Sequence, residues 1–477
     1  MGSEKKNSTP SSAIALKSGL WYTVCNFLFR AMAFISTPVF ARLLTKADMG
    51  LFSNYSSWIT VLTAVTAMDL HSSIIRSKLE FEDDMDSYIY SILSLSTPIT
   101  VSLYIIVLCF SDFFVSFFGV EMKYIHLMFF YLAATPAYQM LITKHRAYYK
   151  YKSFVGLTGV TIVSSTMISL IMVLVMEDKF AGRAFGFYIP YIIIGVSIYI
   201  LLARRGRKIK FKYWKYACVI CIPLVPHLLS FYVLDTSDKI IITRLSGAEY
   251  TAIYSIAYSC FRIVNILMDS MNKAWAPWLL DNLHAENYKE IKDVSKKYIT
   301  IFVMLVVMIL IFVPELIFIL GGKKYMMAKY CLPPLIISCV LQLIYTMYVN
   351  VEFYMKKTVG VAFATTIAAV INIILNIVCI SMNPEYGYII ASYTTLVGYF
   401  ALLVLHYMLV RRMKMAFVFD LKFIIGSLFV IVVLSSLMNL LYGVYLIRYV
   451  IALCYMAVVG FILLKNKDQI LSMLKKK

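Results

Sequence analysis

Apolar residues in this chain gather into long runs that recur from one end to the other, separated by short polar segments. About 14 of these runs are long enough for a helix to cross the hydrocarbon core of a bilayer, which takes about 20 residues. The pattern therefore predicts an all-α integral membrane protein with about 14 transmembrane helices. We place the spans near residues 17–43, 50–75, 87–111, 121–144, 153–176, 184–204, 214–241, 250–280, 297–320, 330–352, 359–382, 386–410, 421–442 and 447–464.

The distribution of basic residues supports this count. With the N-terminus inside, roughly 31 Lys and Arg residues fall in cytoplasmic tails and loops and roughly 11 in external ones. The clearest internal loops are residues 144–152, 204–215 and 411–414. An even number of spans with both termini cytoplasmic is therefore expected. The longest polar connections, 71–86 and 281–296, are predicted to be cytoplasmic loops, which leaves no room for an external catalytic domain.

Composition excludes a soluble protein. Hydrophobic residues make up 61% of the chain, charged residues 15%, and the mean hydropathy is +0.80, whereas soluble domains carry about 25% charge. The net charge of +20 follows from the basic loops, so nucleic acid is not an expected partner. Cys218 and Cys221 have CxxC spacing but lie in an apolar run without a second ligand pair, so we interpret them as buried hydrophobes. The first apolar run contains Arg30 and is expected to be a retained helix, not a signal peptide.

An internal repeat indicates two halves. Residues 42–53 (RLLTKADMGLFS) match residues 244–255 (RLSGAEYTAIYS) without a gap, and each copy joins the first two helices of a six-helix set. Six helices per repeat give two lobes of like orientation, an architecture of transporters. The predicted organisation is a cytoplasmic tail (1–16), an N-lobe (17–210), a C-lobe (211–415), and two further helices with a basic cytoplasmic tail (416–477).

Polar residues at membrane depth are the candidates for function, because charge there is costly and normally faces a cavity or a partner. Helical spacing places Arg30 on one face of the first helix and Arg262 on one face of the eighth. Paired guanidinium groups suit phosphate oxygens and would repel a cation. The alternative role is interhelical pairing or snorkelling, which we prefer for Lys273, Glu315 and Glu352 near helix ends. The candidate substrate-cavity residues are Asn26, Arg30, Asp69, Arg262, Asn265, Asp269 and Lys273.

A second set could hold a coupling cation. Asp235 and Asp238 close the seventh helix, Asn372 and Asn376 lie one turn apart on the eleventh, and Thr394 lies in the twelfth. Their oxygens are the ligands of a hard cation, although such residues also hold membrane helices together. Elsewhere the chain has no HExxH, no Cys/His grouping and no Walker A sequence, so neither an enzyme nor a metal site is predicted.

Three motifs, spread over nearly the whole chain, resemble the Wzx-type polysaccharide flippases of the multidrug/oligosaccharidyl-lipid/polysaccharide exporter superfamily. The matching segments are TPVFARLL (37–44) with GLF (50–52), PHLL (226–229) with DKIII (238–242), and NIILN (372–376) with Tyr386-Gly387.

The resemblance implies a V-shaped, alternating-access transporter of two six-helix lobes plus two C-terminal helices, in a bacterial inner membrane. It implies transfer of undecaprenyl-diphosphate-linked oligosaccharide to the outer leaflet, and leaves open whether the product is the O antigen of lipopolysaccharide, capsule or teichoic acid. Arg30 and Arg262 match the expected diphosphate ligands. Na⁺ or H⁺ coupling is implied, without another cofactor, although an acidic residue is expected where Asn376 stands. Membrane lipids, a polysaccharide polymerase and a chain-length regulator are the implied partners.

Other functions stay open at this stage. A cation-coupled multidrug antiporter or a lipid II flippase would share the fold. A membrane-embedded polysaccharide polymerase or ligase belongs to a different class and would be expected to carry a long external loop. A purely structural role is disfavoured by charge at membrane depth.

Overall fold

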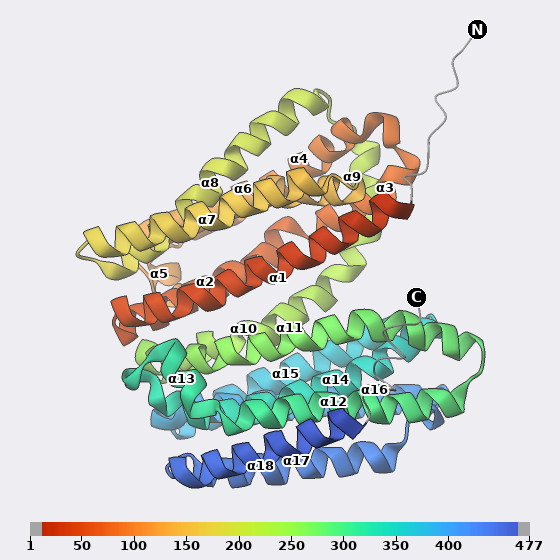
Figure 1. Ribbon diagram of the computed structural model, residues 1–477. Helices are drawn as coiled ribbons and strands as arrows, with labels where there is room; N and C mark the ends of the chain where they lie inside the picture. Colours follow the sequence, from red (N-terminus) through yellow and green to blue (C-terminus); the bar gives the residue numbers. More distant parts are fainter. Residues whose placement is uncertain (1–11, 466–477) are drawn as a thin grey trace. The chain divides into compact units, whose positions relative to one another are not determined.

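The computed structural model describes residues 12–465, and all of the regular structure in that range is helical (Figure 1). The side chains at several positions of the first helix, including Asn26 and Arg30, lie outside the described set. The chain packs as two compact units, unit 1 (Met1–Arg244) and unit 2 (Leu245–Lys477). Helix α9 (Phe211–Cys221) packs on α3 (Ser73–Glu80) and α4 (Met85–Cys109) of unit 1, and the expected lobe boundary at residue 210 stays a prediction. The six-helix lobes themselves stay a prediction.

The helices of unit 1 are α1 (Ser12–Leu43), α2 (Lys46–Ala67), η1 (Leu70–Ser72), α3 (Ser73–Glu80), η2 (Glu82–Asp84), α4 (Met85–Cys109), α5 (Ser111–Phe118), α6 (Met122–Ala147), α7 (Tyr151–Val175), α8 (Lys179–Gly206), α9 (Phe211–Cys221), η3 (Ile222–Leu224) and α10 (Val225–Leu245). Those of unit 2 are α11 (Ala248–His284), α12 (Tyr288–Ile311), α13 (Val313–Gly321), η4 (Lys323–Tyr330), α14 (Leu332–Tyr354), α15 (Thr358–Met382), η5 (Pro384–Tyr386), α16 (Gly387–Arg412), η6 (Ala416–Val418), α17 (Leu421–Leu441) and α18 (Tyr445–Lys465).

The predicted membrane spans are present. In the described part of the chain, 11 helices are long and apolar enough to cross a bilayer, and the bent pair of α2 with α3 passes the same test. Helices α1 and α18 contain shorter apolar stretches, Phe34–Leu43 and Tyr445–Phe461. These elements account for all the runs expected from the hydropathy pattern and confirm a multi-pass, all-α membrane protein.

Two expected loops are largely helical instead. Residues 71–86 contain α3, which leaves the end of α2 at an angle of 58°. Residues 281–296 are divided between the end of α11 and the start of α12, so only the connection at 285–287 is non-helical. Outside the hydrocarbon, water and ion pairs satisfy polar side chains, so a helix can continue through a polar segment. The sequence prediction ended these helices where the polar residues begin, and the helices extend further.

Unit 1 is built around α8, which packs on α7, α6, α4 and α2. Close approach depends on small residues: a Cβ added at Gly186 would lie 2.4 Å from the Cα atom of Ser169 on α7. One at Gly195 would lie 2.7 Å from the carbonyl oxygen of Ala134 on α6. Small residues let membrane helices gain van der Waals contact where the hydrophobic effect gives no advantage.

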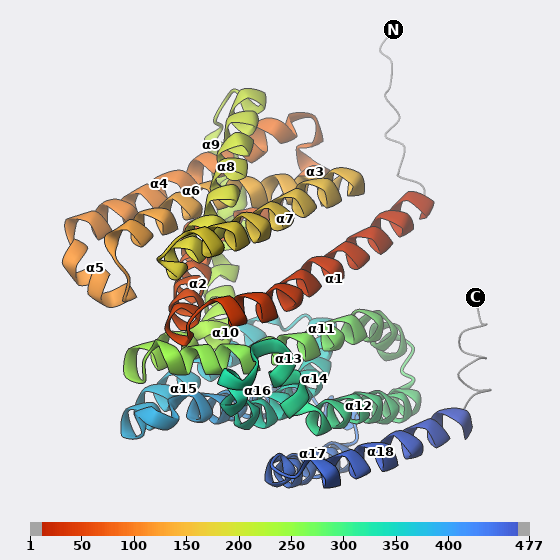
Figure 2. The same cartoon turned by 60° about the vertical axis from the view of Figure 1, so that its left-hand side comes forward.

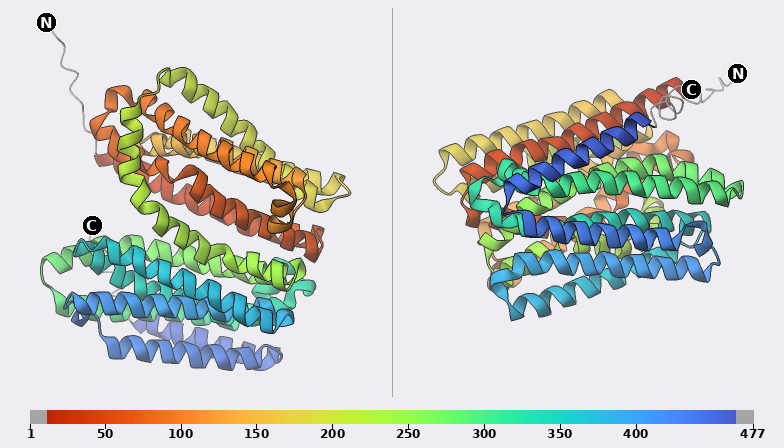
Figure 3. Two further views of the ribbon diagram at one scale, coloured as in Figure 1. Left: turned by 180° about the vertical axis from the view of Figure 1, so that it is seen from behind. Right: turned by 60° about the horizontal axis from the view of Figure 1, so that its bottom comes forward.

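Unit 2 is built around α14, whose apolar stretch is 89% buried and which packs on α11, α12, α15, α16 and α17 (Figure 2). Helices α17 and α18 lie along α12, and the views in Figure 3 show them at the edge of this bundle. Arg448 on α18 holds them there: its guanidinium donates to both carboxylate oxygens of Glu315 on α13, at 2.5 and 2.6 Å. This confirms interhelical pairing for Glu315.

The two copies of the sequence repeat fold alike. The first copy joins α1 to α2, and the second joins α10 to α11, with the helices ending and beginning at corresponding positions. In the first copy, Thr45 and Asp48 form a reciprocal capping box at the start of α2. In the second, Gly247 stands at the position of Thr45, just before α11, with a positive φ of 110°. Glycine adopts this conformation readily, and the start of α11 has no side-chain cap there.

Candidate functional site

The polar side of α11 is the best-defined candidate site in unit 2. It carries Arg262, Asn265, Asp269 and Lys273, the four residues predicted on that helix. Arg262 and Lys273, three turns apart, are exposed, while Asn265 and Asp269 are half-buried at the border with the rest of the unit. The ends of this polar stripe can therefore be reached by a ligand, and its middle is held by packing.

Hydrogen bonds fix the middle of this stripe against α14. The Sγ atom of Cys339 donates to Oδ1 of Asn265 at 3.2 Å. One helical turn beyond Asp269, Asn272 accepts at Oδ1 from Nδ2 of Asn350 at 2.9 Å. Sequence reasoning missed Asn272 and Asn350, although Asn272 lies on the predicted face. These bonds orient α11 and leave its cationic groups outward.

The remaining substrate candidates lie in unit 1. Asn26 and Arg30 fall within α1, but their side chains lie outside the described residues. Asp69 lies at the break between α2 and α3, where both Met68 (φ 43°) and Asp69 (φ 52°) adopt left-handed conformations. Its Oδ1 lies 3.4 Å from Nδ1 of His71, and its carbonyl accepts from Ser72. The bonds from Ser72 therefore fix the backbone of this turn, while the Asp69 carboxylate contacts His71.

Three of the five cation candidates come together in unit 2. Nδ2 of Asn376 donates to Oδ1 of Asn372 at 3.1 Å, and Oγ1 of Thr394 donates to Oδ1 of Asn376 at 2.6 Å. All three side chains are buried. These bonds tie α15 to α16, and a cation site at these residues stays a prediction.

The two acidic candidates lie on α10, in unit 1. Asp238 is buried, 1% exposed, and Asp235 is half-buried. They thus belong to a different unit from Asn372, Asn376 and Thr394. Within the described residues, no group of three or more His, Cys, Asp or Glu side chains could hold a metal ion.

A buried ionisable pair in unit 2 was missed from the sequence. Nδ1 of His406 on α16 lies 2.8 Å from Oε1 of Glu352 on α14, and the two side chains are 1% and 0% exposed. Glu352 was expected to form an interhelical contact, and it does. His406 carries no sequence signal, since it is a lone histidine in an apolar run, 54 residues from its partner.

A half-buried arginine in unit 1 was also missed. The guanidinium of Arg183 on α8 lies 3.6 Å from the ring centre of Phe40 and 4.4 Å from that of Phe52, and it donates to Oγ of Ser169 at 2.9 Å. Cation–π contacts of this kind ease the burial of the charge. Arg183 ties α8 to α1, α2 and α7 and so stabilises the unit.

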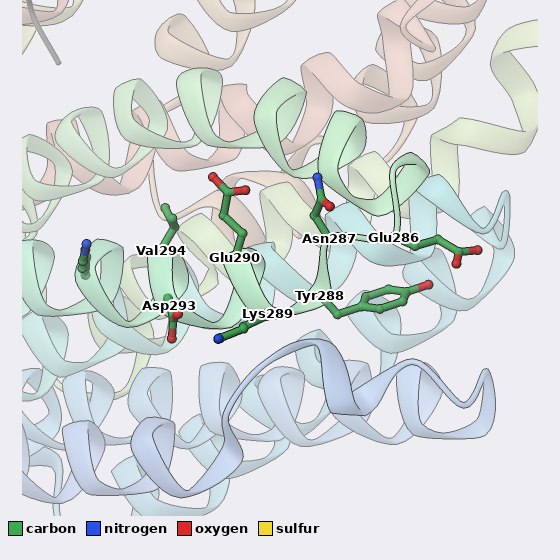
Figure 4. Close-up of a pocket in the computed structure, with 8 residues that line it drawn as sticks. Glu286, Asn287, Tyr288, Lys289, Glu290, Asp293 and Val294 are labelled. Atoms are coloured by element: carbon green, nitrogen blue, oxygen red, sulfur yellow. The ribbon is translucent and has the colours of Figure 1, made fainter.

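One surface hollow of about 630 Å³ surrounds the start of α12 in unit 2 (Figure 4). Its side chains do not converge: Asn287 and Glu290 point to one side of the helix, Lys289 and Asp293 to the other. The mixed charges and divergent directions give no binding geometry for a single ligand.

Taken together, the two compact helical units and the apolar spans define a multi-pass α-helical membrane protein that carries charged residues on a membrane helix. A family model described as polysaccharide biosynthesis protein matches residues 15–283, more than half of the chain. The chain belongs to this polysaccharide biosynthesis family. A second family model, MatE, matches residues 223–378.

Solved structures share the fold. The lipid II flippase MurJ, in an inward closed conformation, superposes with a TM-score of 0.72 at 15% identity, covering 94% of this chain and 99% of that one. An inward-facing multidrug resistance MATE family transporter of the MOP superfamily gives a TM-score of 0.60 at 14% identity, covering 85% and 99%. The chain therefore shares the fold of this flippase and this transporter.

Among curated proteins, an uncharacterized membrane protein of Haemophilus influenzae is 23% identical over 221 residues. The match covers 44% of this chain and 54% of that protein, so the chain spans little more than half the length of this relative.

Proposed function

We propose that this protein moves lipid-linked oligosaccharides, specifically undecaprenyl-diphosphate-linked polysaccharide repeat units, from the cytoplasmic to the outer leaflet of a bacterial inner membrane. One observation carries the proposal: the match to the polysaccharide biosynthesis family falls on a chain whose fold is that of a lipid II flippase. Both involve a sugar polymer precursor, and the flippase fold supplies the means of moving a headgroup across a membrane.

The residues suit a diphosphate headgroup. Arg262 is exposed on the polar side of α11, and a guanidinium group binds phosphate oxygens through two parallel hydrogen bonds. Arg30 holds the corresponding role on α1 in this proposal. The amide and carboxylate groups of Asn265 and Asp269 offer hydrogen bonds to sugar hydroxyls. Alternating access would then expose the headgroup outside while the lipid tail stays in the bilayer.

The test is flipping in proteoliposomes that contain undecaprenyl-diphosphate oligosaccharide, scored by access of the headgroup to an external reagent. Replacing Arg30 and Arg262 with Gln should lower the rate by about tenfold or more for each residue, because hydrogen bonds to charged groups are worth about 1.5–3 kcal/mol. The matched controls are Arg42→Gln and Arg244→Gln. These exposed arginines occupy corresponding positions in the two repeat copies and donate to the backbone carbonyls of Pro38 and Ser116. If the controls lost as much flipping activity, or if the Arg30→Gln/Arg262→Gln double variant flipped at the wild-type rate, the assignment of Arg30 and Arg262 to the diphosphate site would be wrong.

A second candidate, a cation-coupled multidrug antiporter, is favoured by the MatE match to residues 223–378. It would use the same fold for amphipathic cations, which an exposed Arg262 repels. Drug efflux without transport of any polyprenyl-diphosphate oligosaccharide would favour this candidate and exclude the flippase.

The pathway follows from the proposal. We place the protein in biosynthesis of O antigen, capsule or another surface polysaccharide, beside a polymerase that consumes the flipped unit and a chain-length regulator. Deletion should deplete surface polysaccharide and leave lipid-linked repeat units in the inner leaflet.

A further inference from the structure

Glu352 and His406 form a deeply buried ionisable pair in unit 2. Each of the two side chains also has a polar atom without a hydrogen-bond partner in the described residues. Oε1 of Glu352 and Nδ1 of His406 bond each other, but within residues 12–465 Oε2 of Glu352 and Nε2 of His406 have no hydrogen-bond partner. Natural proteins pair nearly all buried polar atoms, so two adjacent exceptions need an explanation. Burial also magnifies any change in charge, because the surroundings screen it poorly.

The number of protons on the two side chains decides how much their burial destabilises the protein. With one shared proton the pair is neutral overall, either as carboxylate with imidazolium or as carboxylic acid with imidazole. Without that proton it carries one negative charge in a dry environment, which is strongly unfavourable. In the packed structure described here, burial therefore favours the electrically neutral pair that shares one proton. Loss of that proton would be less unfavourable if water reached the pair between α14 and α16.

The surroundings offer no permanent compensating charge. Neighbouring α15 presents Gly360, at which a Cβ would lie 3.8 Å from Oε2 of Glu352. Helices α12 and α17 also pack on α14, but in the described chain none of their side chains is recorded in a polar contact with the pair. The Lys357 side chain is exposed, and only its backbone N–H donates to the Glu352 carbonyl. The titratable side chain recorded in contact with the pair is Tyr345 on α14, whose ring stacks on that of His406. Tyr399 stacks on Tyr345, and Tyr348 and Tyr407 contact each other on the same two helices.

An aromatic column connects the pair to the candidate substrate site. The rings of Tyr399 and Tyr345 stack at 6.2 Å, and those of Tyr345 and His406 at 5.5 Å. The ring of Tyr399 also lies 6.4 Å from that of Phe261 on α11, next to Arg262. A shift of α11 against α14 during transport would therefore disturb the packing that keeps the pair dry.

Two other polar groups of unit 2 differ from this pair, although Nε of Arg448 is also buried without a hydrogen-bond partner in the described residues. The Arg448 guanidinium bonds both oxygens of Glu315, and Tyr449 donates to the same carboxylate, as a structural tie would. The Asn372–Asn376–Thr394 cluster contains no carboxylate to attract a cation. Of these three groups, the Glu352–His406 pair joins a carboxylate to an imidazole, and these two side chains can exchange a proton.

We propose that Glu352 and His406 form a proton-binding site that couples transport to the proton gradient. The pair binds one proton when unit 2 is packed as described and releases it to water when the helices α14 and α16 separate during the cycle. The inference rests on the proposed function, because it assigns the coupling ion of the same transport cycle.

The first experiment is flipping in proteoliposomes with and without an imposed pH gradient, and separately with a Na⁺ gradient. Wild type should be stimulated by the pH gradient about fivefold or more, the lower range of coupling between two sites. Glu352→Gln, which keeps an acceptor for His406, should flip at a rate that no longer depends on that gradient. The matched control is Glu315→Gln, which removes a carboxylate from the other ion pair of unit 2. It should keep the full gradient dependence even if its stability falls.

The outcomes separate the two proposals. If wild type transports no polyprenyl-diphosphate oligosaccharide under any gradient, the proposed function fails. If wild type flips but responds only to Na⁺, or if Glu352→Gln keeps the wild-type pH-gradient response, the proton site is wrong and the flippase stands.

A second measurement does not depend on turnover of a variant. Binding of the lipid-linked oligosaccharide to purified protein is measured by calorimetry in two buffers of different ionisation enthalpy, which gives the number of protons exchanged. Wild type and Glu315→Gln should exchange protons equally, while Glu352→Gln and His406→Gln should exchange fewer. The same proton number in all four proteins would overturn the inference.

Discussion

At the scale of single residues, charges in this protein are stabilised by very different surroundings. Arg183 is surrounded by aromatic rings, and Arg448 is held in two parallel bonds to Glu315. Lys296 and Asp420 form a 2.7 Å ion pair with both side chains about one-third exposed. Arg448 is buried and Arg183 is half-buried, so fixed contacts rather than water surround most of each guanidinium group. The Lys296–Asp420 pair contains a titratable carboxylate that is partly exposed to water, so its contribution to stability should change with pH.

The Lys296–Asp420 pair gives a prediction for acid stability. Asp420 lies just before α17, where its Oδ1 accepts from the backbone N–H of Phe423 and so caps the helix. A hydrogen bond from the Lys296 ammonium lowers the pKa of Asp420 below its ordinary value of 3.8. Because the folded pKa is lowered, the pair stabilises the protein above the ordinary pKa, and this contribution is lost as the pH falls through the lowered value.

Thermal unfolding of the detergent-solubilised protein tests this. Asp420→Asn keeps the helix cap but loses the pair, so it should unfold at a lower temperature than wild type at pH 7. The difference between the two should vanish in strong acid. Asp420→Ala loses the cap as well and should unfold lower still. A wild-type advantage that is unchanged across the acid range would contradict the assignment.

At the scale of helices, the approach of backbones matters more than hydropathy. The run at 50–75 was predicted as one span, but it breaks at Met68 and Asp69 and bends by 58°. Nothing in hydropathy marks the break, because the local conformation is set by what α3 and α9 pack against. By contrast, the starts of α2 and α11 follow directly from the repeated sequence, because Thr45 and Gly247 are turn residues at corresponding positions.

The contact of α7 with α8 gives a matched pair of glycine variants. At Gly186 a methyl group would lie 2.4 Å from the Cα of Ser169, so Gly186→Ala must push the helices apart. Overpacking of this kind costs about 1–3 kcal/mol. At Gly156 on α7 a methyl group meets nothing within 4 Å. Gly156→Ala should therefore be neutral or stabilising, by up to about 1 kcal/mol. Unfolding in detergent measures both, and equal effects would show that the α7–α8 contact is not tight.

At the scale of the whole molecule, the distribution of Lys and Arg predicts a single orientation in the membrane. The connection at 285–287 is expected in the cytoplasm and the one at 383–386 outside, with α12, α14 and α15 as the spans between them. The orientation of the chain is set by the cost of moving basic loops across the membrane. The packing of helices within the two units does not determine it.

Labelling of single cysteines by a membrane-impermeant maleimide in intact cells tests the orientation. Glu385→Cys should react, whereas Lys289→Cys should react only after the membrane is opened. Both positions are exposed, and the native exposed cysteines Cys109 and Cys454 are first replaced by Ser. The opposite pattern would invert the topology and place the basic loops outside.

The sequence by itself determined the membrane class, the approximate spans, the repeat and the residues that carry charge inside helices. Each of these depends on local composition: the bilayer requires long apolar runs, and charge at depth stands out against them. It also identified Asn372, Asn376 and Thr394 as a group, because two of them lie one turn apart on one helix.

Only the tertiary structure decided what those polar residues contact. It directs Asn265 toward Cys339, ties the Asn–Thr cluster together by its own hydrogen bonds, and brings His406 to Glu352. The physical reason is that a buried polar atom is stabilised by its partner, and the partner is chosen by the packing of α14 against α11 and α16 rather than by neighbours along the chain.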